Sequence, residues 1–216
     1  MKTLLKLTET YTTLEKQFLL FLNDEGSFPL KGNSFKFLLV STSSNETTIR
    51  NFFDGLLDDM LLFKYNDYYL FIFQNKERLE LQNFIALFNE DLGEKSYVFE
   101  GFSIRKEKKE YLNRVLEIIN DKYTLTKMYS SPADLVLSLN GNKDLKEIIL
   151  DKYLLDNEFI HLIDALFKNN LNISKTASDI YMHRNTVNNK LNNFERDTNI
   201  QIQNFKDAVA VYELLK

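Results

Sequence analysis

The sequence predicts an α+β protein with an N-terminal helix, a mixed domain and an all-helical C-terminal domain. Three observations predict this class. Apolar residues follow a heptad spacing up to Phe21, strand-type and helix-type segments alternate from Phe35 onwards, and two short helical patterns flank a turn between Ile173 and Phe194. A chain of 216 residues can form such separate cores. We expect the domains to span 1–32, 33–142, 143–156 and 157–216.

The N-terminal region repeats apolar residues at alternating spacings of three and four. The repeat consists of Leu4, Leu7, Tyr11, Leu14, Phe18 and Phe21. This pattern is typical of a coiled-coil seam that pairs two subunits. It is equally compatible with a single amphipathic helix packed on its own domain, and nearly three heptads do not separate the two interpretations. A linker with Pro29 and Gly32 follows.

Residues 33–142 are expected to form the mixed domain. Strands are predicted at 35–41, 60–65, 68–73, 97–104 (broken at Gly101) and 125–129, and helices at 46–59, 77–92 and 108–121. Asn66 and Asp67 give the signal of a hairpin turn between the second and third strands. The order β-α-β-β-α-β followed by a helix predicts a ferredoxin-like arrangement.

The rest of the chain reads as helices. Pro132 is placed for the first position of a helix that ends before Asn140. Residues 144–155 are predicted to form a helix that links the two halves. The C-terminal domain then begins with a helix at 158–168 and ends with one at 204–215.

The most specific pattern is Ile173–Phe194, which predicts a helix-turn-helix. Ser174 is a candidate N-cap for a helix over 175–181, Ala177 is small where two helices cross, and Met182 lies in the turn. A second helix opens at His183. Its apolar stripe consists of Val187, Leu191 and Phe194.

The opposite side of this second helix is rich in asparagine, which is a poor helix former. Asparagine pairs bidentately with adenine and arginine with guanine, so this side predicts base contacts in a DNA major groove. Lysine and hydroxyl side chains nearby are candidates for phosphate contacts. The predicted DNA-binding residues are Ser174, Lys175, Thr176, His183, Arg184, Asn185, Thr186, Asn188, Asn189, Lys190 and Asn192. In the alternative interpretation, Asn185 caps the helix and the other asparagines only solvate it.

Charge indicates how such a domain binds DNA. The whole chain carries a net charge of −4, whereas residues 157–216 contain seven basic and seven acidic residues and are neutral. Phosphate neutralisation supplies much of the affinity for DNA. A neutral domain is therefore expected to bind double-stranded DNA weakly by itself, which favours a homodimer.

The same residues carry a family resemblance. The run from His183 to Val187, followed by Lys190 and Leu191, resembles the C-terminal DNA-binding domain of PucR/CdaR-type bacterial transcription regulators and is similar to the Fis-type helix-turn-helix. In this family Arg and Tyr often stand in place of Asn188 and Asn189, and Gly in place of Asn199. The order of the mixed domain resembles the degenerate GGDEF-like domain of such regulators. Its hairpin at 65–69 lacks the paired glycines and the glutamate of a cyclase.

Several classes of function are excluded or disfavoured. The chain has no cysteine for disulfide or thiol chemistry, only two histidines, and no Gly-rich phosphate loop. No apolar run is long enough to span a bilayer. We therefore expect no enzyme activity, no metal, no cofactor and no membrane contact. The predicted function is a cytoplasmic, sequence-specific transcription regulator; a module that binds a partner protein through the helical domain is the alternative. The effector is left open.

Overall fold

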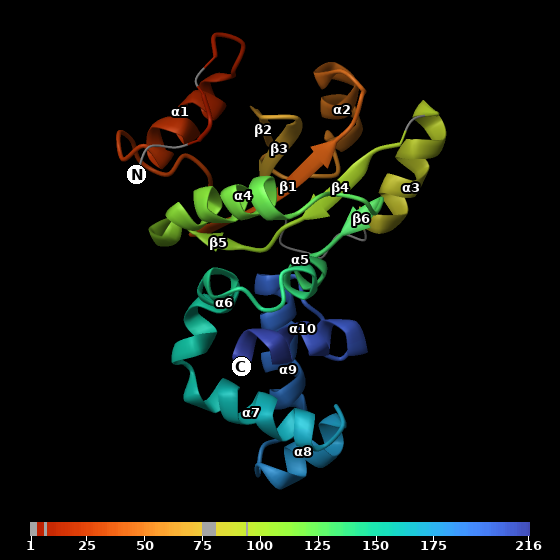
Figure 1. The fold of residues 1–216 in the computed structure, drawn as a ribbon. Coiled ribbons are helices and arrows are strands. Elements are labelled where there is room, and N and C mark those ends of the chain that lie inside the picture. The colour runs from red at the N-terminus through yellow and green to blue at the C-terminus, as the bar shows by residue number, and fades with distance from the viewer. Residues whose placement is uncertain (1–3, 7, 75–80, 94) are drawn as a thin grey trace. The chain divides into compact units, whose positions relative to one another are not determined.

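The computed structural model describes residues 4–6, 8–74, 81–93 and 95–216. The chain divides into two compact units, one up to Ser131 and the other from Pro132 onwards. Figure 1 shows the first unit as a sheet with helices and the second as helices alone. The predicted α+β class is confirmed.

A six-stranded sheet organises the first unit. The strands are β1 (Ser34–Ser41), β2 (Leu61–Tyr65), β3 (Tyr68–Phe73), β4 (Tyr97–Glu100), β5 (Ile104–Arg105) and β6 (Tyr129–Ser130). Their order is β2-β3-β1-β4-β6, and β5 pairs with β1. All pairs are antiparallel except β4 with β6. The β2-β3-β1-β4 order is that of the predicted ferredoxin-like arrangement.

Helices cover both faces of this sheet. They are α1 (Thr13–Leu22), α2 (Glu46–Phe53), α3 (Leu81–Leu92) and α4 (Glu110–Lys122), with a 3-10 turn η1 (Lys106–Lys108) before α4. Helix α2 is shorter than the predicted 46–59 because its C-cap, Asp54, is extended and Gly55 has φ +81°. Residues 77–80, which were predicted to begin the second helix of this domain, lie outside the described residues.

Strand alternation divides the core of this unit into two layers. On one face, Leu38 and Val40 of β1 pack with Ile49 and Phe53 of α2 and with α3. On the other face, Phe35 of β1 meets Phe18 of α1, with ring centroids 5.2 Å apart. Lys109 at the start of α4 joins this second layer through an ion pair with Asp24, at 2.6 Å.

Gly101 separates β4 from β5, as the sequence predicted. A Cβ atom at this position would lie 2.3 Å from the ring of Phe37. Phe37 is completely buried in the sheet. Only glycine therefore allows the chain to pass this close to the ring.

The N-terminal helix is shorter than the repeat from Leu4 to Phe21 predicted. Helix α1 begins at Thr13, because Thr12 and Glu15 form a capping box in which each side chain accepts from the other's backbone N–H. Tyr11, Phe18 and Phe21 of the repeat are buried in their own unit, whereas Leu4 and Leu14 are exposed. Leu7 lies outside the described residues. Of the described repeat, Leu14, Phe18 and Phe21 therefore lie on α1, whereas Leu4 and Tyr11 precede it.

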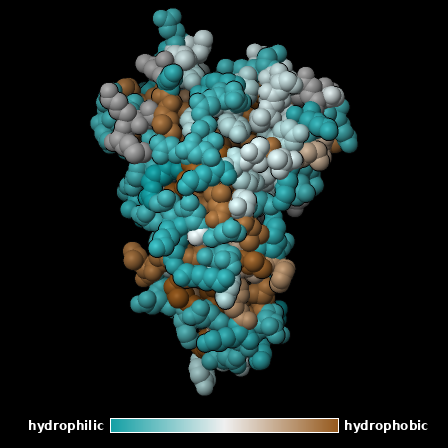
Figure 2. Space-filling view, in the orientation of Figure 1, coloured by the Kyte–Doolittle hydropathy of each residue, from teal (hydrophilic) through white to brown (hydrophobic). Residues whose placement is uncertain are grey.

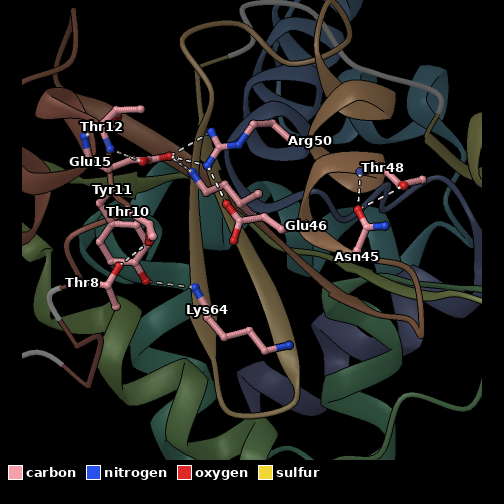
Figure 3. A network of polar contacts seen from close by, with 11 residues as sticks. Thr8, Thr10, Tyr11, Thr12, Glu15, Asn45, Glu46, Thr48, Arg50 and Lys64 are labelled. Carbon is pink, nitrogen blue, oxygen red and sulfur yellow. Dashed lines mark hydrogen bonds and ion pairs between the residues drawn. The ribbon is translucent and has the colours of Figure 1, made fainter.

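A buried carboxylate fixes α1 in place (Figure 3). The Glu15 side chain is 0% exposed, and its Oε1 accepts from both terminal nitrogens of Arg50 at 3.1 Å and from the Leu62 N–H at 2.9 Å. Arg50 lies on α2 and also pairs with Glu46 at 3.2 Å. Tyr11 adds a second tie, since its hydroxyl accepts from the Lys64 N–H at 3.2 Å. The N-terminal segment is therefore an integral part of the first unit.

The second unit contains only helices. They are α5 (Pro132–Ser138), α6 (Lys143–Leu150), the 3-10 helix η2 (Asp151–Leu155), α7 (Asn157–Lys168), α8 (Ile173–Asp179), α9 (Arg184–Thr198) and α10 (Phe205–Leu215). Helix α10 returns to the start of this unit. Lys206 of α10 pairs with Asp134 of α5 at 3.1 Å, and Lys146 of α6 donates to the Leu215 carbonyl at 3.3 Å. Residues 132–156, expected in the mixed domain and a linker, consequently lie in the helical unit.

Candidate nucleic-acid interface

The helix-turn-helix is held by a compact apolar core. The predicted stripe of Val187, Leu191 and Phe194 on α9 is buried, and Ala177 of α8 is 4% exposed. The ring of Phe194 stacks on Phe159 of α7, and Tyr153 packs edge-on against Phe194; both centroid distances are 5.0 Å. This packing fixes which side of α9 faces the surface.

The N-cap of α8 is Asn172, whereas the sequence predicted Ser174. The Asn172 side chain accepts from the Lys175 N–H at 3.0 Å, and the helix begins at Ile173. Asparagine caps a helix as well as serine does, so the helix can begin after the asparagine that precedes Ser174 by two residues. Ser174 and Lys175 are exposed in the first turn. Both remain available to a ligand.

The position of Thr176 does not agree with its predicted role as a phosphate contact. Its side chain is 0% exposed, and its hydroxyl donates to the Asn172 carbonyl at 2.8 Å. Thr176 therefore belongs to the interior of the motif. A hydrogen bond also joins the end of α7 to the end of α8, where the Asn169 amide donates to Asp179 at 2.8 Å.

A tight turn joins α8 to α9. The Tyr181 N–H donates to the Ser178 carbonyl at 3.2 Å, and the Met182 N–H donates to the Ala177 carbonyl at 2.9 Å. These two bonds form a Schellman motif, which requires a left-handed residue at the position of Tyr181. Tyr181 has φ +53° and is 99% exposed. Neither property was foreseen from the sequence.

His183 caps the N-terminus of α9. Its Nδ1 accepts from the Asn185 N–H at 3.2 Å, so His183, and not Asn185, is the capping residue. Arg184, Asn185 and Thr186 are exposed in the first turn. The structure therefore places three predicted contact residues together at the end of α9 that a helix-turn-helix inserts into DNA.

Further along α9, the predicted residues differ in their exposure. Asn189 and Asn192 are exposed, and Asn188 is partly buried. Lys190 pairs with Glu158 of α7 at 3.1 Å, and its side chain is 25% exposed. A phosphate contact by Lys190 would therefore compete with this ion pair.

A second polar group lies near the C-terminal end of α9. Asp197 accepts from Tyr153 at 2.9 Å and from Lys152 at 2.6 Å, and Arg196 pairs with it at 3.2 Å. Burial by itself would raise the pKa of Asp197, but the hydrogen bonds from Lys152 and Tyr153 and the neighbouring positive charges lower this pKa below its ordinary value. Burial raises the pKa of Tyr153, and the charge of Asp197 adds to the rise. Asp197 thus holds η2 against α9 as a charged carboxylate.

The surface of this unit is mostly hydrophilic with separate apolar areas (Figure 2). One area surrounds a hollow of about 290 Å³ lined by Phe167, Leu171, Phe205 and Tyr212, among others. Phe205 is 79% exposed and Tyr212 is 50% exposed.

Among the described residues, no group of three or more His, Asp or Glu side chains is placed to hold a metal ion. None of the helices in the same part of the chain combines the length and apolar character needed to cross a bilayer.

The geometry defines a helix-turn-helix protein with an exposed, amide-rich second helix. Residues 159–216 match the profile of the PucR C-terminal helix-turn-helix domain, which confirms the resemblance for this segment. The segment is a domain of that family, and the match supports a transcription regulator.

No curated protein matches the chain significantly. The structure is similar to that of a regulator of polyketide synthase expression from Bifidobacterium adolescentis, with 14% sequence identity and a TM-score of 0.45, covering 97% of this chain and 93% of that chain.

Proposed function

We propose that this protein is a bacterial, cytoplasmic transcription regulator that binds specific double-stranded DNA as a homodimer through α8 and α9. The observation that carries the proposal is the grouping of Arg184, Asn185 and Thr186 on the exposed first turn of α9, behind which the apolar stripe is fully packed. The N-terminal end of the second helix is the part of this motif that reaches base edges. No catalytic step and no cofactor form part of the proposal.

The proposed contacts fall into two groups. Arg184, Asn185, Asn188, Asn189 and Asn192 are assigned to base edges, where amide and guanidinium groups pair with adenine and guanine. Ser174, Lys175, His183, Thr186 and Lys190 are assigned to the sugar–phosphate backbone, which positions the protein without reading sequence. Thr176 is no longer included, because its side chain is buried.

Charge supports two copies on one DNA site. Residues 157–216 carry equal numbers of basic and acidic residues, so one copy neutralises few phosphates. Two copies double the contacts and make the second binding event effectively intramolecular. We therefore propose a DNA-bound homodimer whose two motifs occupy successive major grooves.

A binding-site selection with the full chain tests base reading. Arg184→Ala and Asn189→Ala are expected to relax the preference at one or two base positions, with a loss of about 1–3 kcal/mol of discrimination at each. Lys175→Ala is the matched control: it should weaken binding to all sequences and reduce the slope of log affinity against log salt by about one. A consensus that is unchanged in both the Arg184 and Asn189 variants would remove the base-reading role.

Sedimentation of the protein with the selected DNA tests the stoichiometry. We expect two protein chains for each DNA duplex that carries both half-sites, and one chain for a duplex that carries a single half-site. One chain on the full site would contradict the dimer and leave DNA binding intact.

A second candidate is binding of a partner protein by the helical unit. It is favoured by the apolar hollow beside α10, where Phe205 and Tyr212 are exposed. The same selection distinguishes the two candidates, because a protein that enriches no DNA sequence above background would favour the partner-binding function.

The mixed unit is proposed to be a degenerate GGDEF-like domain that carries a signal and performs no reaction. Its strand order supports this, and the β2–β3 turn contains Asn66 and Asp67 where a cyclase has glycines and an acidic pair. Incubation with GTP should accordingly yield no cyclic dinucleotide.

A further inference from the structure

We propose that Tyr181 is a DNA-backbone contact, whose phenol donates a hydrogen bond to a phosphate beside the major groove that α9 enters. This inference rests on the proposed DNA binding and adds a residue that the helix pattern did not indicate. It starts from two properties of Tyr181, its backbone conformation and its exposure.

The backbone conformation of Tyr181 carries a cost. The Schellman turn demands a left-handed residue, and Tyr181 supplies it at φ +53°. Glycine occupies this position most often, because a Cβ atom destabilises the left-handed conformation by about 1 kcal/mol. A tyrosine here is therefore less stable than a glycine would be, unless its side chain gains something in return.

The other non-glycine residues with a positive φ in the helical unit show how this cost is usually met. Asn140, Asn170 and Asn199 have the amide side chain that tolerates this conformation, and Asp151 has a similar short polar side chain. Leu171 is the other exception, and it is partly buried in the apolar hollow beside α10. Packing can offset its strain.

Tyr181 gains no such compensation within its own unit. Its side chain is 99% exposed and makes no hydrogen bond or ring contact with another residue of the described chain. Tyrosine is a large amphipathic side chain that is enriched at binding surfaces, and strained residues concentrate at functional sites. The compensation therefore lies with a bound partner.

The position along the chain indicates which part of the partner it meets. Tyr181 precedes the N-cap His183 by two residues, so their Cα atoms are at most about 7.6 Å apart. A major groove is about 12 Å wide, and the end of α9 that enters it lies between two phosphate backbones. A tyrosine this close to the helix end reaches a phosphate, and the tyrosine hydroxyl is a regular donor to phosphate oxygens.

The test compares Tyr181→Gly, Tyr181→Asn and Tyr181→Phe in the full chain, with Leu155→Ala as the control for removing an exposed apolar side chain (Leu155 is 86% exposed). Affinity is measured for the selected DNA and for an unrelated duplex over a range of salt concentrations. Thermal unfolding is recorded for each variant.

We expect Tyr181→Gly to raise the Tm and yet to weaken binding to both duplexes by about tenfold. Tyr181→Asn should weaken binding equally without loss of stability. Tyr181→Phe should lose most of the same affinity, because the hydroxyl is the donor. The salt slope should stay at the wild-type value, since no charge is removed, and this separates Tyr181 from Lys175. Leu155→Ala should bind as the wild type does.

Two outcomes overturn the inference at different levels. If the wild type binds DNA and both Tyr181→Gly and Tyr181→Asn bind it equally well, Tyr181 is not a contact, whereas the proposed function stands. If the wild type enriches no DNA at all, the proposed function fails first.

Discussion

The two units each contain a carboxylate that holds a helix through several donors, but the two carboxylates differ in burial. Glu15 in the first unit is 0% exposed and joins α1, α2 and β2. Asp197 in the second unit has a side chain that is 20% exposed, and its partners Lys152 and Arg196 are about half exposed. The less water surrounds a charged group, the more its hydrogen bonds stabilise the fold. Leaving such a group unpaired then destabilises the fold by a larger amount. We therefore expect Glu15 to contribute more to the free energy of unfolding than Asp197 does.

The largest expected effect is that of Glu15→Ala. This variant removes the Glu15 oxygen that accepts from both terminal nitrogens of Arg50 and leaves the Leu62 N–H without an acceptor. We expect a loss of about 3 kcal/mol in the free energy of unfolding, measured by chemical denaturation. Glu46→Gln is the matched control, because Glu46 pairs with the same Arg50 but its side chain is 49% exposed. Glu46→Gln should lower the free energy of unfolding by less than about 1 kcal/mol. Equal losses for the two variants would contradict the expected effect of burial.

A smaller effect is expected for Asp197→Asn. Hydrogen bonds to a charged acceptor contribute about 1.5–3 kcal/mol, and exposure of the partners reduces this, so we expect a loss of about 1–2 kcal/mol at pH 7. The folded pKa is lowered, so the stabilisation is present above the unfolded pKa of about 3.9 and is lost as the pH falls through the folded pKa.

Denaturation of the wild type and Asp197→Asn between pH 2 and 7 measures this dependence. The difference in the free energy of unfolding should be constant from about pH 7 to 5 and shrink below about pH 4. A difference that persists unchanged to pH 2 would mean that the charge of Asp197 is not what stabilises the unit.

The smallest effect on stability is expected for Glu158→Gln, which breaks the ion pair with Lys190. The Glu158 side chain is 60% exposed, so the free energy of unfolding should change by less than about 0.5 kcal/mol. Under the proposed function, the released Lys190 should raise the affinity for DNA a few-fold and steepen its salt dependence. An unchanged affinity would show that Lys190 does not contact phosphate.

Local patterns in the sequence were sufficient for most of the fold. The spacing of Val187, Leu191 and Phe194 predicted the buried side of α9, and the strand and helix order predicted the β2-β3-β1-β4 sheet. These features depend on periodicity over a few residues, which can be read directly from the sequence. The family resemblance at His183–Leu191 rests on the same kind of local information, and the matched profile begins at residue 159.

Contacts between distant residues decided the rest. The N-terminal repeat did not reveal that α1 starts at Thr13, where Glu15 turns inward to Arg50 and Leu62, residues 35 and 47 positions away. The return of α10 to α5 assigned residues 132–156 to the helical unit through Lys206 and Asp134, 72 positions apart. Burial of Thr176, pairing of Lys190 and exposure of Tyr181 likewise depend on which surfaces meet. The sequence by itself determined the helices, the strands and the exposed, amide-rich side of α9, because short-range periodicity encodes them. Only the tertiary structure decided which polar side chains remain free to bind, because burial is a property of the packed chain.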